Sequence, residues 1–328
     1  MTIDTKTVFY YVTIVVFICA LSCYHNVNVP LRNNVPSVLN GTLENRTMYY
    51  PDSLIDSLTV SDLNDSIVTV SNLWIGSSGL IQKTLGPKTV LLFYPGNQLG
   101  SFSGQFDIVD QQNGKCTVGY NFSKVYIETF DLLPMKDWVF YNTQDTGNYI
   151  KRNFISIADA TLEFIFPQSD SESLSPVCKT GIRSSFRIKG DFTCSVEFFL
   201  LEFLKNGYEC GFFVSTSQDT GQWAGDVAGI YLSAINASTE IKCKSNNGLV
   251  STTVRDYFSG VLWLSKTDTT MNFIYSSMGN SVQDTLNRLT FTISDDLYIH
   301  LRMVVDNRLE TRSCSWNNLT IHKGTLVF

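Results

Sequence analysis

Short runs of apolar residues, interrupted by turn residues, make up most of the chain from about residue 67 onward. Between Phe192 and Phe198 apolar and polar residues strictly alternate, which is the period of a β-strand with one buried face. The stretch from Leu297 to Val305 alternates in the same way and predicts a second half-buried strand. Only Ser53 to Leu63 could hold a short helix. The pattern therefore predicts an all-β chain, folded as an antiparallel sandwich or barrel.

The middle of the chain predicts further strands at Thr89–Tyr94, Phe102–Val109 and Thr117–Glu128. We interpret residues 67–126 as a β-rich segment, either a small domain or extra strands on the domain that follows. The run Gly211–Ser215 comes soon after Asn206-Gly207, a dipeptide that tolerates positive φ and favours a hairpin.

The N-terminal segment, residues 1–23, has the features of a secretory signal peptide. Lys6 precedes an uncharged, mostly apolar run from Val8 to Ser22, which is short for a membrane span. The small residues Ala20 and Ser22 suit cleavage before Cys23. We therefore expect a secreted, extracellular protein. The alternatives are an uncleaved membrane anchor and a lipid anchor at Cys23.

Residues 24–66 are rich in Asn, Ser, Asp, Thr and Pro and predict a polar linker. Six Asn-x-Ser/Thr sequences would be glycan acceptors in a eukaryotic host, at Asn40, Asn45, Asn64, Asn121, Asn236 and Asn318.

The chain has 8 cysteines, and six of them lie beyond the N-terminal segment. An even number in an exported chain predicts up to three disulfides, with the pairing left open. The candidates are Cys116, Cys178, Cys194, Cys210, Cys243 and Cys314.

Composition supports the fold class and narrows the partners. Aromatic residues make up 13% of the chain, which favours half-buried pleated surfaces. The net charge is −6, so the basic footprint of a nucleic-acid-binding protein is missing. We expect no nucleic-acid partner.

Several segments of the C-terminal part occur in an order typical of one superfamily. Trp138 follows a lead-in from Phe130, and Gly181–Phe192 ends in Gly-Asp-Phe before the alternating strand. The chain closes with Trp316-Asn-Asn-Leu-Thr-Ile, although the usual closing Asp is replaced by Trp316-Asn317. This order resembles the concanavalin A-like, laminin-G-like jelly-roll superfamily over roughly residues 127–328. The resemblance implies two curved antiparallel sheets packed face to face, with the first and last segments close together.

The superfamily includes lectins, adhesion modules and glycoside hydrolases, so the resemblance does not fix an activity. Glycosidases of this general fold carry two Glu on one strand with an Asp between them. Here Glu197 and Glu202 are the weak catalytic candidates, and Phe199 occupies the position of the Asp. Strand periodicity places the two Glu on opposite faces unless a bulge intervenes.

A loop between two predicted strands, residues 217–226, is the best binding candidate. Its tryptophan could stack on a sugar ring, and its carboxylates could accept hydroxyl protons or hold Ca²⁺. The candidate ligand-binding residues are Asp219, Gln222, Trp223 and Asp226. The alternative is a plain solvated loop.

The sequence has few residues or motifs for histidine-dependent catalysis, zinc binding or phosphate binding. The chain has 3 histidines and no zinc-type Cys/His cluster, nucleophile elbow or phosphate-binding loop. We expect no resident cofactor, with Ca²⁺ as the one ion to consider. The tryptophans Trp74, Trp138, Trp263 and Trp316 are predicted to be core or edge aromatics.

Together these features predict a secreted or cell-surface binding protein without catalytic activity, whose partner is a carbohydrate or an extracellular glycoprotein. The alternatives are a structural or adhesive protein that binds no small ligand, and a divergent secreted glycoside hydrolase.

Overall fold

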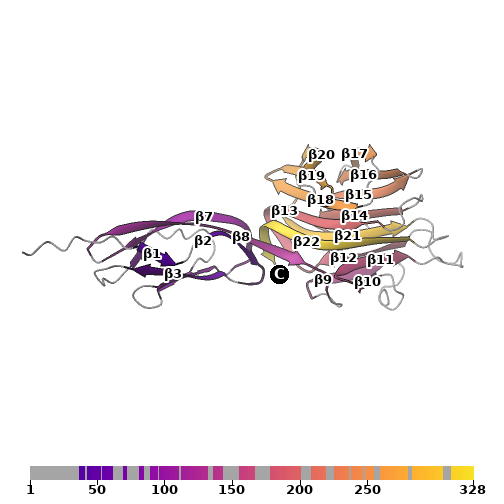
Figure 1. The fold of residues 1–328 in the computed structure, drawn as a ribbon. Coiled ribbons are helices and arrows are strands. Elements are labelled where there is room, and N and C mark those ends of the chain that lie inside the picture. Colours follow the sequence, from indigo (N-terminus) through magenta and orange to yellow (C-terminus); the bar gives the residue numbers. More distant parts are fainter. Residues whose placement is uncertain are drawn as a thin grey trace, which may run out of the picture.

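The structure is a computed structural model in which all the regular secondary structure of the described residues is β-strand. Figure 1 shows a smaller lobe, built from the N-terminal strands, beside a larger one. The predicted all-β class is confirmed. Within the described part of the chain, no helix is long and apolar enough to cross a membrane. The described residues are 37–40, 43–52, 54–61, 69–71, 81–84, 89–94, 96–110, 112–131, 136–142, 155–166, 178–200, 208–218, 225–235, 238–246, 248–254, 259–279, 283–305 and 312–328.

The small lobe has two layers of strands. One layer has the order β1-β3-β6-β5, and the other is built by the pairs β2–β8, β8–β7 and β7–β4. The strands are β1 (Ser37–Asn40), β2 (Leu43–Tyr49), β3 (Leu54–Ser61), β4 (Thr69–Ser71), β5 (Ile81–Thr84), β6 (Thr89–Tyr94), β7 (Gln98–Val109) and β8 (Lys115–Glu128).

The large lobe is an antiparallel sandwich of two sheets. Sheet I has the order β10-β11-β22-β13-β18-β19-β20, and sheet II the order β9-β12-β21-β14-β15-β16-β17. The strands are β9 (Trp138–Asn142), β10 (Ile155–Ala158), β11 (Thr161–Phe166), β12 (Cys178–Ser184), β13 (Arg187–Phe199), β14 (Tyr208–Ser215), β15 (Val227–Ile235), β16 (Ser238–Ser245), β17 (Gly248–Val254), β18 (Ser259–Thr267), β19 (Thr270–Ser276), β20 (Gln283–Thr290), β21 (Asp296–Val305) and β22 (Arg312–Val327).

Alternating residues of the strands build the core between the sheets. On β13 the residues Phe192, Cys194, Val196 and Phe198 are buried, as the alternation predicted. The same inward set on β21 begins at Leu297 and is also buried. Because every second side chain of a strand points to one face, these positions send the intervening side chains to the outer faces of the sandwich.

Strand β21 departs from the half-buried pattern that the sequence predicted. Its outward residues Tyr298, His300 and Arg302 are buried too, and the ring of His300 stacks on Phe213 of β14 at 4.8 Å. Phe213 and Tyr231 of the neighbouring strands are buried on the same face. The outer face of sheet II therefore carries a second set of buried side chains.

The chain changes sheets between β13 and β14. β13 pairs with β18 and β22 in sheet I, whereas β14 pairs with β15 and β21 in sheet II. The prediction of a hairpin at Asn206-Gly207 is therefore wrong as far as these two strands are concerned. The dipeptide itself lies outside the described residues.

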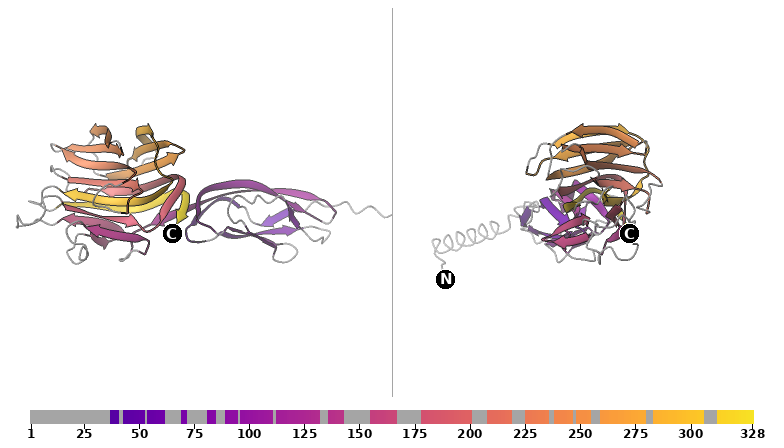
Figure 2. Two further views of the ribbon diagram at one scale, coloured as in Figure 1. Left: turned by 180° about the vertical axis from the view of Figure 1, so that it is seen from behind. Right: turned by 90° about the vertical axis from the view of Figure 1, so that its right-hand side faces the viewer.

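The two lobes share a strand junction at β22. The long β7–β8 hairpin reaches the edge of β22, where Leu319 lies opposite Glu128 and Gly324 opposite Leu99 (Figure 1). The last strand of the sandwich thus meets the segment that precedes its first strand, which confirms that the two ends of the fold lie close together. The C terminus lies at this junction in Figure 2.

The N-terminal part of the chain differs from the sequence-based expectation. Residues predicted as a polar linker contain β1, β2 and β3, and β3 occupies the stretch considered for a short helix. The segment 67–126 supplies β4 to β8, so it completes the small lobe and also adds strands to β22. The predicted signal peptide, residues 1–23, lies outside the described residues.

The structure corrects the prediction of disulfides. Five of the six candidates, Cys116, Cys194, Cys210, Cys243 and Cys314, form no disulfide, and the side chain of Cys178 is not described. The reason is the strand register. None of the five has another cysteine opposite it on a neighbouring strand. The cross-strand partners are Leu264 and Ile321 for Cys194, Leu232 and Met303 for Cys210, Ile230 and Ser251 for Cys243, Phe164 for Cys314 and Ile108 for Cys116. Four of the five are buried, and burial raises the pKa of the Cys194 thiol.

Candidate functional site

A groove lies on the outer face of sheet I, across the neighbouring strands β11, β22, β13 and β18. It has a volume of about 240 Å³. Carboxylate, amide, hydroxyl, aromatic and thioether groups all contribute to its wall, from Thr161, Glu197, Phe198, Phe199, Ser259, Met278, Ser315, Trp316 and Asn317.

Strand β13 supplies the centre of the groove because of its alternation. Since Val196 and Phe198 fill the core, Glu197 and Phe199 must point outward. Register then brings their partners into place, with Asn317 of β22 opposite Glu197 and Ser315 opposite Phe199. A shift of register between Ser195 and Glu197 marks a bulge, a feature that commonly re-aims side chains near binding sites.

A hydrogen bond from β22 orients Glu197. The side-chain Nδ2 of Asn318 donates to Glu197 Oε2 at 2.9 Å. Asn318 has φ of 45°, in the left-handed region that asparagine tolerates better than most residues. A second carboxylate, Glu163 of β11, lies opposite Ser315 and accepts a hydrogen bond from Ser156. One carboxylate thus lines the groove, and a second lies on the same face beside it.

Two apolar side chains stand at the rim of the groove. Phe199 is 50% exposed and Met278 is 51% exposed, and both line the groove. An exposed phenyl ring and an exposed thioether at a polar groove offer apolar contact without burial in the core, which is typical of binding surfaces.

An aromatic platform continues the same face along β13. Trp263 of β18 lies opposite Ser195, and its ring stacks on His322 of β22 at 4.8 Å and 21°. The hydroxyl of Ser195 is 2.9 Å from Nε2 of His322, and Trp263 Nε1 donates to the hydroxyl of Ser276. Partial burial lowers the pKa of His322, so the ring is neutral at pH 7.

Of the predicted loop site, the structure describes Asp226 but not Asp219, Gln222 or Trp223. Both carboxylate oxygens of Asp226 accept hydrogen bonds, Oδ1 from Asn246 Nδ2 at 2.7 Å and Oδ2 from the backbone N–H of Ser294 at 2.8 Å. This residue ties three loops together at one end of the sandwich. Ligand binding by the loop stays a prediction.

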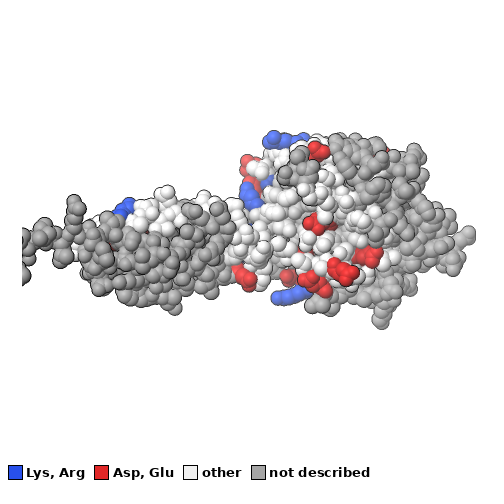
Figure 3. Space-filling model, viewed as in Figure 1, with Lys and Arg blue, Asp and Glu red and all other residues white. Residues whose placement is uncertain are grey.

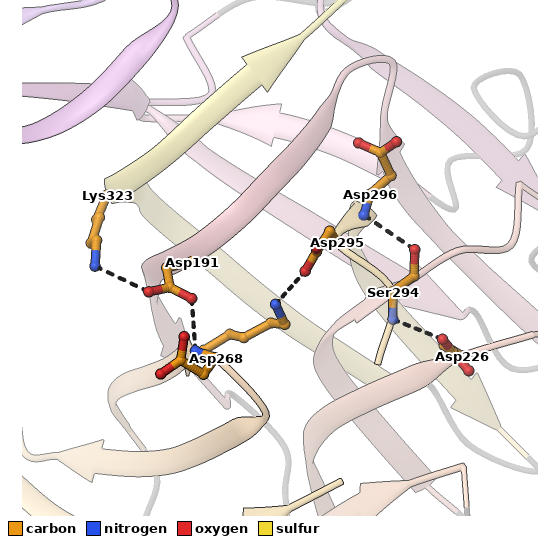
Figure 4. Close-up of polar contacts among 8 residues, drawn as sticks. Asp191, Asp226, Asp268, Ser294, Asp295, Asp296 and Lys323 are labelled. Atoms are coloured by element: carbon orange, nitrogen blue, oxygen red, sulfur yellow. Dashed lines mark hydrogen bonds and ion pairs between the residues drawn. The ribbon is translucent and has the colours of Figure 1, made fainter. Parts of the chain in front are cut away.

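Asp226 belongs to a group of acidic residues at that end (Figure 4). Lys266, whose side chain is almost fully buried, lies 2.6 Å from Asp295, and its hydrogen bond and charge lower the pKa of that carboxyl. Asp191 accepts a hydrogen bond from the backbone N–H of Asp268 and pairs with Lys323. Throughout the described ranges, no group of His, Cys, Asp and Glu side chains is arranged to hold a metal ion. Each of these contacts links strands or loops, which is a structural role.

The other predicted site residues are divided between the described and undescribed parts of the chain. Glu197 lies in the groove, whereas Glu202 lies outside the described residues. Of the sequon asparagines, Asn121 is exposed on β8, whereas the amide nitrogen of Asn318 is held by Glu197. Asn40 and Asn45 lie on strands, but their side chains are not described, and Asn64 and Asn236 are not described.

Sequence reasoning missed three residues of this face: Phe199, Trp263 and His322. Trp138 and Trp316 are buried, as predicted, but Trp263 is only partly buried and faces outward. The alternation of β13 already implied an outward Phe199. A large aromatic residue at a solvent-facing strand position was the signal to notice.

Comparisons with known proteins add a likeness of overall fold. No family model matches the chain, and no curated protein matches it. Among solved structures it is similar to a prokaryotic β-1,3-1,4-glucanase (lichenase) derived from a mouse hindgut metagenome, with 13% identity and a TM-score of 0.46 over 61% of this chain and 99% of that one. It is also similar to a Bacillus licheniformis β-glucanase (12%, TM-score 0.44, 61% and 98%) and to lectin II from Ulex europaeus (10%, TM-score 0.44, 62% and 98%).

Proposed function

We propose that the chain is an extracellular carbohydrate-binding protein without catalytic activity, which holds a neutral glycan in the groove on the outer face of sheet I. The observation that carries the proposal is the combination of an exposed ring, Phe199, with an oriented carboxylate, Glu197, in one accessible groove. The location outside the cell rests on the apolar N-terminal segment of the sequence alone.

The chemistry of the groove suits a sugar. Pyranose rings present an apolar face, which stacks on aromatic side chains, and an edge of hydroxyl groups, which pairs with carboxylates, amides and hydroxyls. Phe199 and Met278 supply the first kind of contact, and Glu197, Asn317 and Ser315 the second. Each is on a strand or at a strand end, so the groove is largely pre-formed and little ordering is needed on binding.

The charge of the groove favours uncharged over acidic sugars. Glu197 lies in it, and Glu163 stands on the same face of the neighbouring β11. In Figure 3 acidic side chains are scattered over the large lobe, with basic ones toward its margins. A uronic acid, sialic acid or sulfated sugar would meet like charge, which opposes binding.

Hydrolysis is the weaker alternative. Glycosidases use a pair of carboxyl groups on either side of the scissile bond. Among the described residues that line the groove, Glu197 is the single carboxylate, and its Oε2 already accepts a hydrogen bond from Asn318. Turnover of a polysaccharide that survives the double change Glu197→Gln and Glu202→Gln would exclude these residues as its catalysts.

A glycan array tests the proposal. The secreted form, residues 24–328, would be applied to neutral, amino and acidic glycans, in calcium and then in chelator. We expect retention on neutral glycans in both buffers, and loss of at least tenfold in affinity for Phe199→Ala, the size expected for an aromatic anchor of a binding site.

The matched control is Val139→Ala. Val139 is also an exposed apolar residue, at 42%, but it lies on β9 at the edge of sheet II. Its removal should leave retention unchanged. An array without signal, or one on which both variants behave alike, would contradict the proposal.

A further inference from the structure

The outer face of sheet I continues beyond the sandwich onto the small lobe. Ile127 of β8 lies opposite Thr320 of β22, and Thr320 lies opposite Ser195 of β13. Residues that are paired across strands point to the same side of a sheet. Ser195, Thr320 and Ile127 therefore form one outward row that crosses from the large lobe to the small one.

The row extends to β2 through exposed apolar side chains. Val125 is two residues from Ile127 on β8, so both point outward, and Tyr49 of β2 lies opposite Val125. Tyr49 is 52% exposed and Ile127 is 36% exposed. Together they form an apolar continuation of the outward row, which is what an extended binding surface would need.

The surface between the groove and Tyr49 carries further aromatic and apolar side chains. It starts at Phe199, passes the stacked Trp263 and His322 beside Ser195, and reaches Ile127. It crosses from β13 to β2 over β22 and β8. With about 4.8 Å between strands and about 3.3 Å per residue along them, the two ends of the path, Phe199 and Tyr49, are roughly 25 Å apart.

We infer that a linear, neutral polysaccharide binds along this path, from the groove at Phe199 across the platform at Trp263 to Tyr49, so that both lobes contact one chain. The inference rests on the proposed function of the groove and extends it to the length of the ligand. Its occupant is a sugar chain because the path joins three rings, those of Phe199, Trp263 and Tyr49, and continues directly from the groove. A protein partner would need a broad patch with a continuous apolar centre.

The β8–β22 junction holds the two ends of the path in a fixed relation. Tyr50, next to Tyr49, stacks on Phe328 at the end of the chain, and Tyr126, next to Ile127, packs edge-on against Phe186 of the sandwich. The inward neighbours of the exposed residues are thus anchored across the lobe junction. Binding along the path would need little rearrangement of the lobes.

Oligosaccharide ladders test the inference. Probes of two to eight residues, built from glucose, galactose, mannose or N-acetylglucosamine, would be titrated calorimetrically into residues 24–328. We expect the affinity of the ladder that binds to rise beyond the trisaccharide. Tyr49→Ala should lower the affinity for the octasaccharide roughly threefold to tenfold, the range of one aromatic contact, and leave the disaccharide unaffected.

Ile127→Ala is the second variant on the path, and Val139→Ala is again the control off the path. A disaccharide that binds with no gain from added length, or an octasaccharide affinity unchanged by both Tyr49→Ala and Ile127→Ala, would overturn the extended path while the groove stands. No binding of any ladder would overturn both the path and the proposed function. Circular dichroism of each variant would verify that the fold is retained.

Discussion

At the scale of single residues, the outward positions of β13 determine what the face of sheet I can do. Glu197 and Phe199 occupy the positions where the glycosidase pattern has a Glu and an Asp. Replacing the Asp by a phenyl ring removes a group that could hold charge and adds one that can stack on a sugar. Of the outward residues of β13 that line the groove, one is a carboxylate and one is an exposed ring.

Two histidines predict how stability depends on pH. Burial, reinforced by the charges of Arg183 and Arg302, lowers the pKa of His300 well below its usual value, and burial lowers that of His322. Below about pH 6.5 the unfolded chain therefore binds protons that the folded chain does not, and the folded state loses up to about 1.4 kcal/mol per pH unit for each histidine.

Urea unfolding at pH 7.5, 6.5 and 5.5 would measure this loss. We expect the free energy of unfolding to fall over that range, and the fall to be smaller in His322→Gln, which keeps a polar partner for Ser195. If the free energy of unfolding fell equally with pH in the variant and in the wild type, protonation of His322 would not destabilise the folded state.

At the scale of elements, the strands with strict alternation were predictable and those with two buried faces were not. The pattern of β13 follows directly from the sequence, because one buried face imposes a period of two. The bounds of β6 follow from an apolar run that ends at Pro95-Gly96. The outer face of β21 was misjudged, because the residues that pack on it, such as Phe213 of β14, are distant in sequence. The register that separates the cysteines is likewise a property of the assembled sheets. The groove was only partly predictable. Glu197 was a candidate because it is a carboxylate, whereas the role of Phe199 depends on the groove residues that β11, β18 and β22 place beside it.

On the outer face of sheet II, a glycine lies opposite an aromatic ring. Gly211 lies opposite Tyr231, and a Cβ on Gly211 would come within 2.6 Å of that ring. Gly229 lies opposite Phe213, and a Cβ on it would meet the Phe213 Cβ and the carbonyl oxygen of Phe212 rather than the ring. Rings that lie flat over cross-strand glycines pack densely, and the rings of Phe213 and Tyr231 are within 12° of parallel.

A double-mutant cycle tests this pairing. Gly211→Ala should cost about 2 kcal/mol of stability by overpacking, and most of that cost should disappear in a Tyr231→Ser background, where the ring is absent. Chemical unfolding of the four proteins would measure the coupling. Additive effects would mean that the glycine is needed for the backbone and not for the ring.

The cysteines give a second test at this scale. Because the five described cysteines form no disulfide, reduction should leave the melting temperature unchanged, whereas loss of a typical disulfide would cost about 2–4 kcal/mol. Alkylation followed by mass spectrometry, without reductant, should label at least five thiols in the unfolded chain. In the folded chain we expect faster labelling at Cys116, which is partly exposed, than at the buried ones. A mass that shows fewer reactive thiols would contradict the free state.

At the scale of the whole molecule, the lobe junction connects the parts into one unit. Phe186 is fully buried there and contacts Tyr126, Trp138 and Phe328, one from each segment that meets at the junction. Glu128 adds polar contacts, since it accepts hydrogen bonds from Trp138 Nε1 and the Tyr126 hydroxyl.

Truncation of Phe186 should therefore lower the free energy of unfolding of the whole molecule. Phe186→Ala should cost about 3–5 kcal/mol, the usual range for a buried phenylalanine, while Phe328→Ala should cost less because that ring is 58% exposed. Calorimetric melting would show one transition in the wild type if the lobes unfold together. Equal costs for the two variants would mean that the junction is not packed as described.

The central claim is that the outer face of sheet I is the glycan-binding surface, and hydrogen–deuterium exchange tests it most directly. The secreted form would be compared with and without the neutral hexasaccharide that the array retains most strongly. Slower exchange in peptides covering residues 195–199 and 313–322 is the result that the account predicts. Slower exchange confined to residues 217–226, or to the strands of sheet II, would contradict it and return the binding site to the loop that the sequence first indicated.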